Sequence, residues 1–306
     1  MNNPPINPGD TRPNPAVRLS RRNRRRLSLP LIFLVAFFTP IFCCGLTLLT
    51  YLVFPPAHVD VLILGVDGRG AEGFVSRTDS IMLLGINPSR LRTSILSFPR
   101  DLFIDVPGYG SQRINTVNVL GEQQKLGGGT ELLMAAINQD FVVQVDRYAR
   151  LDFQGFVELI DAVGGVTIDV ERSIVDSSYP TEDGGVTTIQ FDSGVQHMDG
   201  ERALIYARTR HADDDYQRAG RQQQVVSALL GRMAIPVYWP AAISVLNRSL
   251  ETNLTVIDMA LLAPPVLLNI GRYERLVIDR DYVLGGAEGV VPNYKKIYPW
   301  LEGHFE

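Results

Sequence analysis

The chain has 306 residues, of which 45% are hydrophobic and 20% charged, so it can form a sizeable folded core and is not a disordered protein. Residues 1–54 hold seven arginines and one acid, which leaves 22 basic and 32 acidic residues and a net charge of −10 in the remainder. This acidic balance argues against a general binder of nucleic acids or other polyanions.

The N-terminus combines an arginine-rich tail with a long apolar run. Six arginines between positions 18 and 26 precede an uncharged run of 24 residues, Leu31 to Phe54. At about 1.5 Å per residue this run crosses about 30 Å of hydrocarbon. A signal peptide is the alternative, but its apolar region is shorter, about 7–15 residues, and no small-x-small cleavage site follows Phe54.

The arginines before the run, with none directly after it, orient the N-terminus toward the cytoplasm. We therefore predict a single-pass protein of the cell membrane with three parts. These are a cytoplasmic arginine-rich tail over 1–28, a transmembrane helix over 29–55, and an extracytoplasmic domain over 56–306.

Three short aliphatic segments follow, and each is predicted to be a strand: residues 59–67, 79–87 and 92–99. The sequence Asn87-Pro88-Ser89 joins the second and third segments tightly enough for a hairpin. Because the apolar residues run almost continuously, these strands are expected to be buried on both faces.

Helices and strands then alternate along the chain. Helical periodicity or a strand pattern predicts, in order, a helix at 130–139, a strand at 142–152, a helix at 153–163, a strand at 166–170, a polar glycine-rich excursion at 179–194, helices at 199–208 and 217–233, a helical region at 259–268, a strand at 274–284 and a closing helix at 293–301. No repeat or low-complexity linker interrupts them. This pattern predicts one α/β domain of about 250 residues.

Charged residues collect where the predicted strands begin or end. Asp67 follows the first strand, Arg77 and Asp79 open the second, and Arg100 follows the third. Arg113 opens a helical region. The segment Tyr206 to Gln224, YARTRHADDDYQRAGRQQQ, adds four arginines, three aspartates and a histidine within nineteen residues.

Each of these features also has a purely structural interpretation. Asp67-Gly68 is compatible with an ordinary turn, and Arg100-Asp101 with a surface ion pair worth little. Arg208 and Arg210 can complement the dipole at the end of a helix, and Asp215 can cap the next one. Taken together, however, they describe a pocket with carboxylates for a metal and arginines for an anion, which are the parts that phosphoryl transfer requires.

The segments GVDGRG, RTDSIMLLGINP, SFPRDLFIDVPGYG, RIN, LDFQGFVELIDAVGGVTIDV and YARTRHADDDYQRAGRQQQ, in this order behind one apolar helix, resemble the LytR-CpsA-Psr family of membrane-anchored cell-envelope proteins. The resemblance implies a three-layer α-β-α sandwich with a mixed central sheet and an apolar tunnel for a prenyl chain. It also implies a phosphotransferase that moves a glycopolymer from an undecaprenyl-pyrophosphate carrier onto a peptidoglycan hydroxyl.

The same resemblance assigns the site residues. Asp67 and Asp79 match the carboxylates associated with Mg²⁺, and Asp79 is our candidate general base, acting with Arg100, Arg208 and Arg210. The pyrophosphate-binding set implied by the family pattern comprises Arg77, Arg100, Arg113, Arg208, Arg210, Asp215, Arg218, Arg221 and Gln222. Arg113 stands where many members have lysine.

Two alternatives remain open at this point. One is a non-catalytic envelope protein that binds prenyl pyrophosphates without transferring anything. The other is a membrane-bound transcriptional attenuator, which is less favoured because the sequence contains no visible helix-turn-helix and only a short arginine tail is predicted to be cytoplasmic. That tail is better suited to anionic lipid headgroups than to specific DNA.

Overall fold

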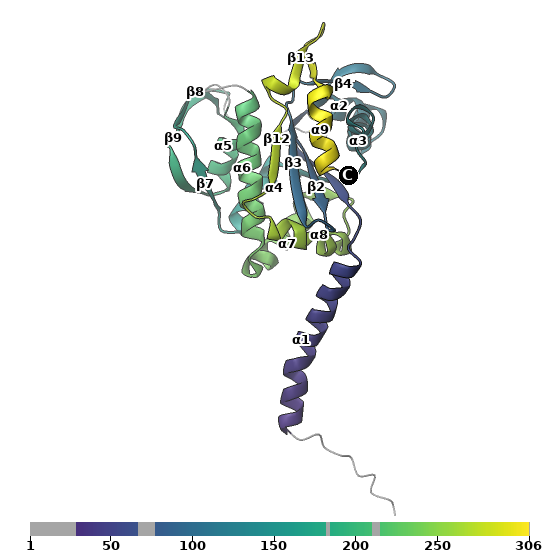
Figure 1. The fold of residues 1–306 in the computed structure, drawn as a ribbon. Helices are drawn as coiled ribbons and strands as arrows, with labels where there is room; N and C mark the ends of the chain where they lie inside the picture. The colour runs from purple at the N-terminus through teal and green to yellow at the C-terminus, as the bar shows by residue number, and fades with distance from the viewer. Residues whose placement is uncertain (1–28, 67–76, 182–183, 210–214, 306) are drawn as a thin grey trace, which may run out of the picture. The chain divides into compact units, whose positions relative to one another are not determined.

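The structure, a computed structural model, describes residues 29–66, 77–181, 184–209 and 215–305 (Figure 1). The chain separates into two compact units, residues 1–53 and 54–306. The first contains α1 (Leu29–Val53). Within α1, Ala36–Val53 has a mean hydropathy of 1.9, and α1 is the one unbroken helix among the described residues that is long and apolar enough to cross a membrane.

The second unit is built on a six-stranded mixed sheet. Its strand order is β11 (Leu250–Thr252), β6 (Val145–Asp152), β1 (Val59–Val66), β2 (Thr78–Asn87), β3 (Arg92–Phe98) and β12 (Glu274–Val277). Strands β1, β2 and β3 are antiparallel neighbours, whereas β6 runs parallel to β1 and β12 parallel to β3. The predicted strands at 59–67, 79–87 and 92–99, and the hairpin between the last two, are therefore confirmed.

The strand registers define the two ends of this sheet. Val66 pairs with Thr78, and Ile81 pairs with Phe98, so the end of β1, the start of β2 and the end of β3 lie together. We call this the Arg100 end. The opposite end, where Val59 pairs with Ile86, is the Val59 end.

Helices cover both faces of the sheet, because the strand side chains are apolar on both. One face packs against α2 (Ile114–Gln124), α3 (Gly128–Phe141) and α9 (Tyr294–His304). The other packs against α6 (Asp215–Met233) and α8 (Val256–Leu268). Figure 1 shows β3 and β12 between α6 on one side and α9 on the other. The expected three-layer arrangement with a mixed central sheet is confirmed.

A further apolar cluster lies beside the sheet and is the core of the remaining elements. It joins α4 (Phe153–Ala162), α5 (Gly200–Arg208), α6, α7 (Trp239–Ser249) and the strands β7 (Val166–Val170), β8 (Ile174–Pro180), β9 (Val186–Phe191) and β10 (Gly194–Met198).

Two short elements connect these parts of the fold. A small hairpin of β4 (Phe103–Val106) and β5 (Gly110–Arg113) precedes α2, and a 3-10 turn, η1 (Pro236–Tyr238), precedes α7.

The segments predicted at 179–194 and 274–284 differ from the sequence-based expectation, and the sequence analysis predicted no element where β4, β5, α7 and β11 lie. The polar excursion predicted at 179–194 overlaps a hairpin of β8 and β9 followed by β10. The strand predicted at 274–284 ends at Val277, because the Asp279 side chain accepts a hydrogen bond from the backbone N–H of Asp281 and turns the chain. A 3-10 turn, η2 (Arg280–Tyr282), then leads into β13 (Val283–Gly285), which pairs with β14 (Val290–Pro292).

Gly200 permits the close crossing of α4 and α5. A Cβ at this position would lie 2.2 Å from the Val157 backbone oxygen, which cannot move aside without disturbing α4. We expect Gly200→Ala to destabilise the protein by about 1–3 kcal/mol through overpacking, measured by thermal or urea unfolding. Gly220→Ala is the matched control, because a Cβ at Gly220 in α6 meets nothing within 4 Å. That change should be neutral or stabilising by up to about 1 kcal/mol, and equal losses in both variants would contradict this account.

Candidate functional site

Charged side chains form a row at the Arg100 end of the sheet. Arg100 Nη1 lies 3.6 Å from Asp79 Oδ1, and Arg100 Nε lies 3.5 Å from Asp101 Oδ2. Arg113 Nη1 lies 3.4 Å from Asp101 Oδ1 and so extends the row. Arg77 precedes β2 and is exposed. Asp79 and Arg100 meet because antiparallel β2 and β3 bring the start of β2 beside the end of β3. The β4–β5 hairpin returns Arg113 to the same place, where Asn115 N donates a hydrogen bond to the backbone oxygen of Arg100.

Two cavities share Asp79 and Arg100. The smaller, of about 390 Å³, is lined by polar residues and by many aliphatic ones from the sheet and from α4, α5, α6 and α7. Its polar lining includes five predicted site residues: Asp79, Arg100, Arg208, Arg218 and Gln222. The larger, of about 510 Å³, is polar and is lined by Arg77, Asp79, Arg100, Asp101, Arg113, Asn115 and Thr116.

The smaller cavity has a polar part and an apolar part because polar and then apolar side chains follow one another along one face of α6. Residues spaced by three or four positions lie on one face of a helix. On α6 that face carries Arg218 and Gln222 in the first two turns and then Val225, Val226, Leu229 and Leu230, and all six line the cavity. The sheet contributes Ile63, Met82 and Ala149. One continuous space thus joins charged groups at the Arg100 end to an apolar interior.

Arg208 is held at this cavity by an aromatic ring. It occupies the last turn of α5, and its guanidinium carbon lies 4.5 Å from the centre of the Phe153 ring. Phe153 is the first residue of α4 and also lines the cavity. A guanidinium stacked on an aromatic face is fixed in orientation while its edge stays available for an anion.

Arg221 has a different position from the other arginines of α6. It is buried, and its Nε donates a hydrogen bond to the backbone oxygen of Tyr206 at 3.0 Å, while its Nη2 donates to the backbone oxygen of Thr209. These carbonyls belong to the C-terminal end of α5. Arg221 lines a separate groove on the other side of α6 rather than the two cavities that meet at Asp79. Arg221 therefore holds the C-terminal end of α5 in place, and with it Arg208.

Three further residues at the smaller cavity were missed by sequence reasoning. Asp152 and Phe153 stand where β6 ends and α4 begins. The search for charged residues at the ends of predicted strands, which found Asp79, would also have found this position. Asp176 is buried in β8 and accepts hydrogen bonds from Thr209 Oγ1 at 2.7 Å and from Ser178 N at 3.0 Å. It lay inside a polar segment without a recognisable motif, so the sequence held no signal for it.

The predicted metal site is described only in part. Asp67 and Arg210 lie outside the described residues, as does His211, and Asp215 begins α6 without a described side chain. Within the described ranges no group of three His, Cys, Asp or Glu residues is placed to hold a metal. Mg²⁺ is commonly held by one or two carboxylates together with water and substrate phosphates. The half-exposed Asp79 carboxylate between the two cavities fits such a shared site.

The chain belongs to the LytR-CpsA-Psr family, whose model matches residues 56–272. Among curated relatives, the polyisoprenyl-teichoic acid–peptidoglycan teichoic acid transferase TagU of Oceanobacillus iheyensis is 34% identical over 178 residues, which is 58% of this chain and 52% of the relative. TagT of Bacillus subtilis, which has the same transferase name, is 28% identical over 67% of this chain and 62% of its own length.

Another relative carries a different kind of name. Regulatory protein MsrR of Staphylococcus aureus is 33% identical over 64% of this chain and 56% of its own length. The chain therefore spans between 52% and 62% of the length of these three relatives.

Solved structures show the same fold. The crystal structure of Bacillus subtilis TagV matches with a TM-score of 0.65 and 24% identity, over 81% of this chain and 97% of that one. A structure described as TagT bound to LI-WTA matches with a TM-score of 0.62 and 22% identity, over 81% of this chain and 91% of that one. At these identities the likeness establishes the architecture of the second unit.

Proposed function

We propose that this protein is a membrane-anchored phosphotransferase that moves a glycopolymer from undecaprenyl pyrophosphate onto a peptidoglycan hydroxyl on the outer side of the membrane. The observation that carries the proposal is the cavity that joins charged groups at the Arg100 end to an apolar interior. A prenyl pyrophosphate has the matching division into an anionic head and an apolar chain. The names of the TagU and TagT relatives support the same class of reaction.

The arginines suit the pyrophosphate. Arg100, Arg208 and Arg218 line the polar part of the cavity from the turn after β3, from α5 and from α6, so they can contact phosphate oxygens from several directions. Arginine binds such oxygens in pairs through its planar fork. Arg77 and Arg113 line the neighbouring polar cavity, and we assign this cavity to the glycan side of the substrate. Arg210 and Asp215 are assigned to the same set on the family pattern.

The transfer itself needs a proton acceptor and a stabilised leaving group. The acceptor hydroxyl attacks the phosphorus that bears the sugar, a new oxygen–phosphorus bond forms, and the bond to the bridging oxygen breaks. Asp79 takes the proton of the attacking hydroxyl, and undecaprenyl phosphate leaves with its charge facing the arginines. Asp67 and Asp79 would hold Mg²⁺, which neutralises charge on the phosphates when bound.

Turnover by the purified full chain tests this proposal. A prenyl-pyrophosphate-linked saccharide, Mg²⁺ and a peptidoglycan acceptor are supplied, and released prenyl phosphate is measured. We expect Asp79→Asn to lower the rate by about 100-fold, in the range of a lost general base, while the exposed Asp169→Asn on β7 stays near wild type.

The non-catalytic alternative gives a different result in the same assay. A protein that only holds the carrier would bind the lipid tightly and release no prenyl phosphate in its wild-type form. Equal rates in wild type and Asp79→Asn would remove Asp79 from the mechanism.

A further inference from the structure

Helix α8 is apolar around its whole circumference and yet largely exposed. Its sequence, VIDMALLAPPVLL, contains a single charged residue, Asp258, and only Leu262 and Pro265 are buried. Val256 is 82% and Ile257 is 70% exposed, and the other exposed large apolar residues of the helix are Met259, Leu261, Leu267 and Leu268. A helix on a water-facing surface normally has a polar outer face, and a contiguous apolar one marks a contact site.

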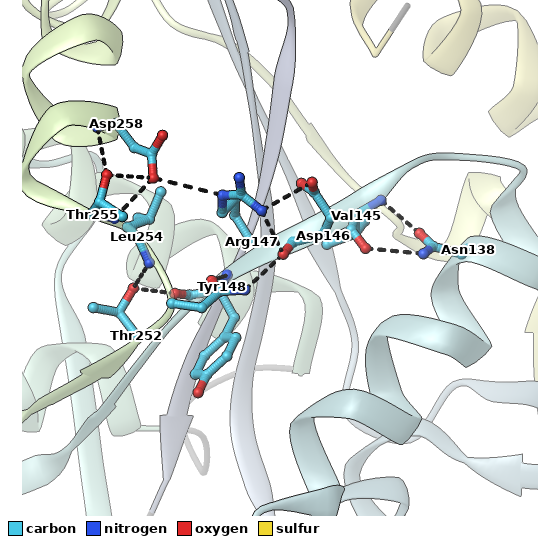
Figure 2. A network of polar contacts seen from close by, with 10 residues as sticks. Asn138, Val145, Asp146, Arg147, Tyr148, Thr252, Leu254, Thr255 and Asp258 are labelled. Carbon is cyan, nitrogen blue, oxygen red and sulfur yellow. Dashed lines mark hydrogen bonds and ion pairs between the residues drawn. The ribbon is translucent and has the colours of Figure 1, made fainter.

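The N-terminus of α8 is fixed beside the start of β6 (Figure 2). The Asn253 side chain donates a hydrogen bond to the backbone oxygen of Asp146 at 2.7 Å. Figure 2 shows Arg147 beside Asp258, and Arg147 Nε lies 3.8 Å from Asp258 Oδ2. Arg147 pairs with Val61 near the beginning of β1. The exposed first turn of α8 is therefore at the Val59 end of the sheet.

The other end of α8 lies at the same edge. Asn269, the residue after the helix, donates from Nδ2 to the backbone oxygen of Leu91 at 2.5 Å. Leu91 is in the turn between β2 and β3, next to the strand pair Val59 and Ile86. Helix α8 thus crosses the Val59 end from β6 to the β2–β3 turn.

A second set of exposed apolar residues lies where α6 turns into α7. Ile235, Val237 and Trp239 are exposed there, with Val237 at 75%. Leu230, near the C-terminal end of α6, packs against the apolar cluster that contains Val61 of β1 and Leu262 of α8, so this corner lies beside α8. Tryptophan is enriched where proteins meet the membrane–water interface. We call the exposed apolar residues of α8 and this corner the α8 face.

The length of the connecting chain limits how far the Val59 end can be from a membrane that holds α1. Helix α1 ends at Val53 and β1 begins at Val59. Six residue steps of about 3.5 Å span at most about 21 Å. This limit comes from the covalent chain alone, and it applies to the Val59 end and not to the far end of the sheet.

We propose that the α8 face docks on the outer surface of the same bilayer, with its apolar side chains in the interfacial layer. This inference rests on the membrane anchoring in the proposed function. Exposed Arg90 in the β2–β3 turn and Arg272 just after α8 place positive charge at the rim of the face, where it would attract anionic headgroups. Asp258, whose pKa the Thr255 backbone and hydroxyl groups lower, faces Arg147 of the domain.

Docking in this way would shorten the path of the lipid substrate. Leu230 of α6 and Leu246 of α7 line the apolar part of the site cavity, and both belong to the helices that form the corner of the α8 face. The prenyl chain would then pass from the bilayer to the cavity without a long exposure to water.

The test measures where single labels lie in a bilayer. The full chain, with Cys43→Ala and Cys44→Ala, is given one cysteine by Ile257→Cys, labelled with a nitroxide and reconstituted in vesicles of phosphatidylcholine and phosphatidylglycerol. Val195→Cys is the matched control, because Val195 is a similarly exposed apolar residue, at 72%, on β10. Val237→Cys provides a second position on the α8 face.

Docking predicts that the labels at 257 and 237 collide more with oxygen than with a water-soluble nickel complex, and that the label at 195 shows the reverse. Nickel collisions at 257 and 237 equal to those at 195 would overturn the inference, since the face would then be in water. Exclusion of both reagents from 257 and 237 would also overturn it, because another protein surface would then cover the face. Substrate is absent, so the result is independent of whether the turnover assay succeeds.

Discussion

Arg218→Ala should lower kcat/KM for a prenyl-pyrophosphate substrate by about 100- to 1,000-fold, the range seen when one donor to a developing oxyanion is removed. Arg218 lines the cavity from the first turns of α6 and is 95% buried, so its charge acts where water is largely excluded. Alanine removes the charge and both arms of the guanidinium fork. Lysine at the same position should recover only part of the rate, because it restores the charge but not the fork.

The control for this variant lies on the same helix. Gln217 is exposed one position earlier, and Gln217→Ala should leave kcat/KM within about threefold of wild type. Circular dichroism and thermal unfolding establish that both variants are folded. If folded Arg218→Ala turns over substrate as fast as Gln217→Ala, Arg218 does not bind the pyrophosphate.

Arg150→Met should destabilise the protein by about 3–5 kcal/mol and lower its Tm by roughly 10 °C. Arg150 is 2% exposed in β6, and its Nη1 donates to Glu122 Oε1 at 3.0 Å and to Asn118 Oδ1 at 3.2 Å. Its Nε donates to Glu251 Oε2 at 3.1 Å. The substitution leaves the buried Glu122 carboxylate of α2 without its guanidinium partner, and an unpaired buried charge is far more costly than a lost surface pair.

Arg147 offers a comparison on the same strand. Its side chain makes ion pairs to Asp146 and Asp258 (Figure 2). Both pairs are partly exposed, so Arg147→Met should cost less than about 1 kcal/mol. Adding Glu122→Gln to Arg150→Met should recover part of the lost stability, since no net charge is then left buried. Equal Tm values for Arg147→Met and Arg150→Met would show that the Arg150 network does not stabilise the fold.

The central strands were predictable because they are buried on both faces and therefore read as continuous aliphatic runs. Strand β8 was not predictable in this way. Asp176 is buried there while its neighbour Val175 is 55% exposed, which inverts the pattern that marks a strand. The Asp176 carboxylate is satisfied by Thr209, a residue 33 positions away, and only the folded chain brings that partner near.

Part of the candidate site was predictable from the sequence, as part of the fold was. Asp79 and Arg100 could be placed together because they stand at adjoining strand ends, and their side chains lie 3.6 Å apart. The spacing of Arg218, Arg221 and Gln222 put all three on one stretch of helix, but it could not separate Arg221 from the other two. That separation depends on α5, whose terminal carbonyls accept the Arg221 hydrogen bonds.

The central claim is that one cavity holds both halves of a prenyl pyrophosphate, and a crystal structure of the full chain with that lipid tests it most directly. We expect the two phosphates to lie between Arg208 and Arg218, near Asp79. The prenyl chain should lie beside Val226 and Leu230 of α6. Phosphates bound elsewhere, or a chain lying outside this cavity, would contradict the account.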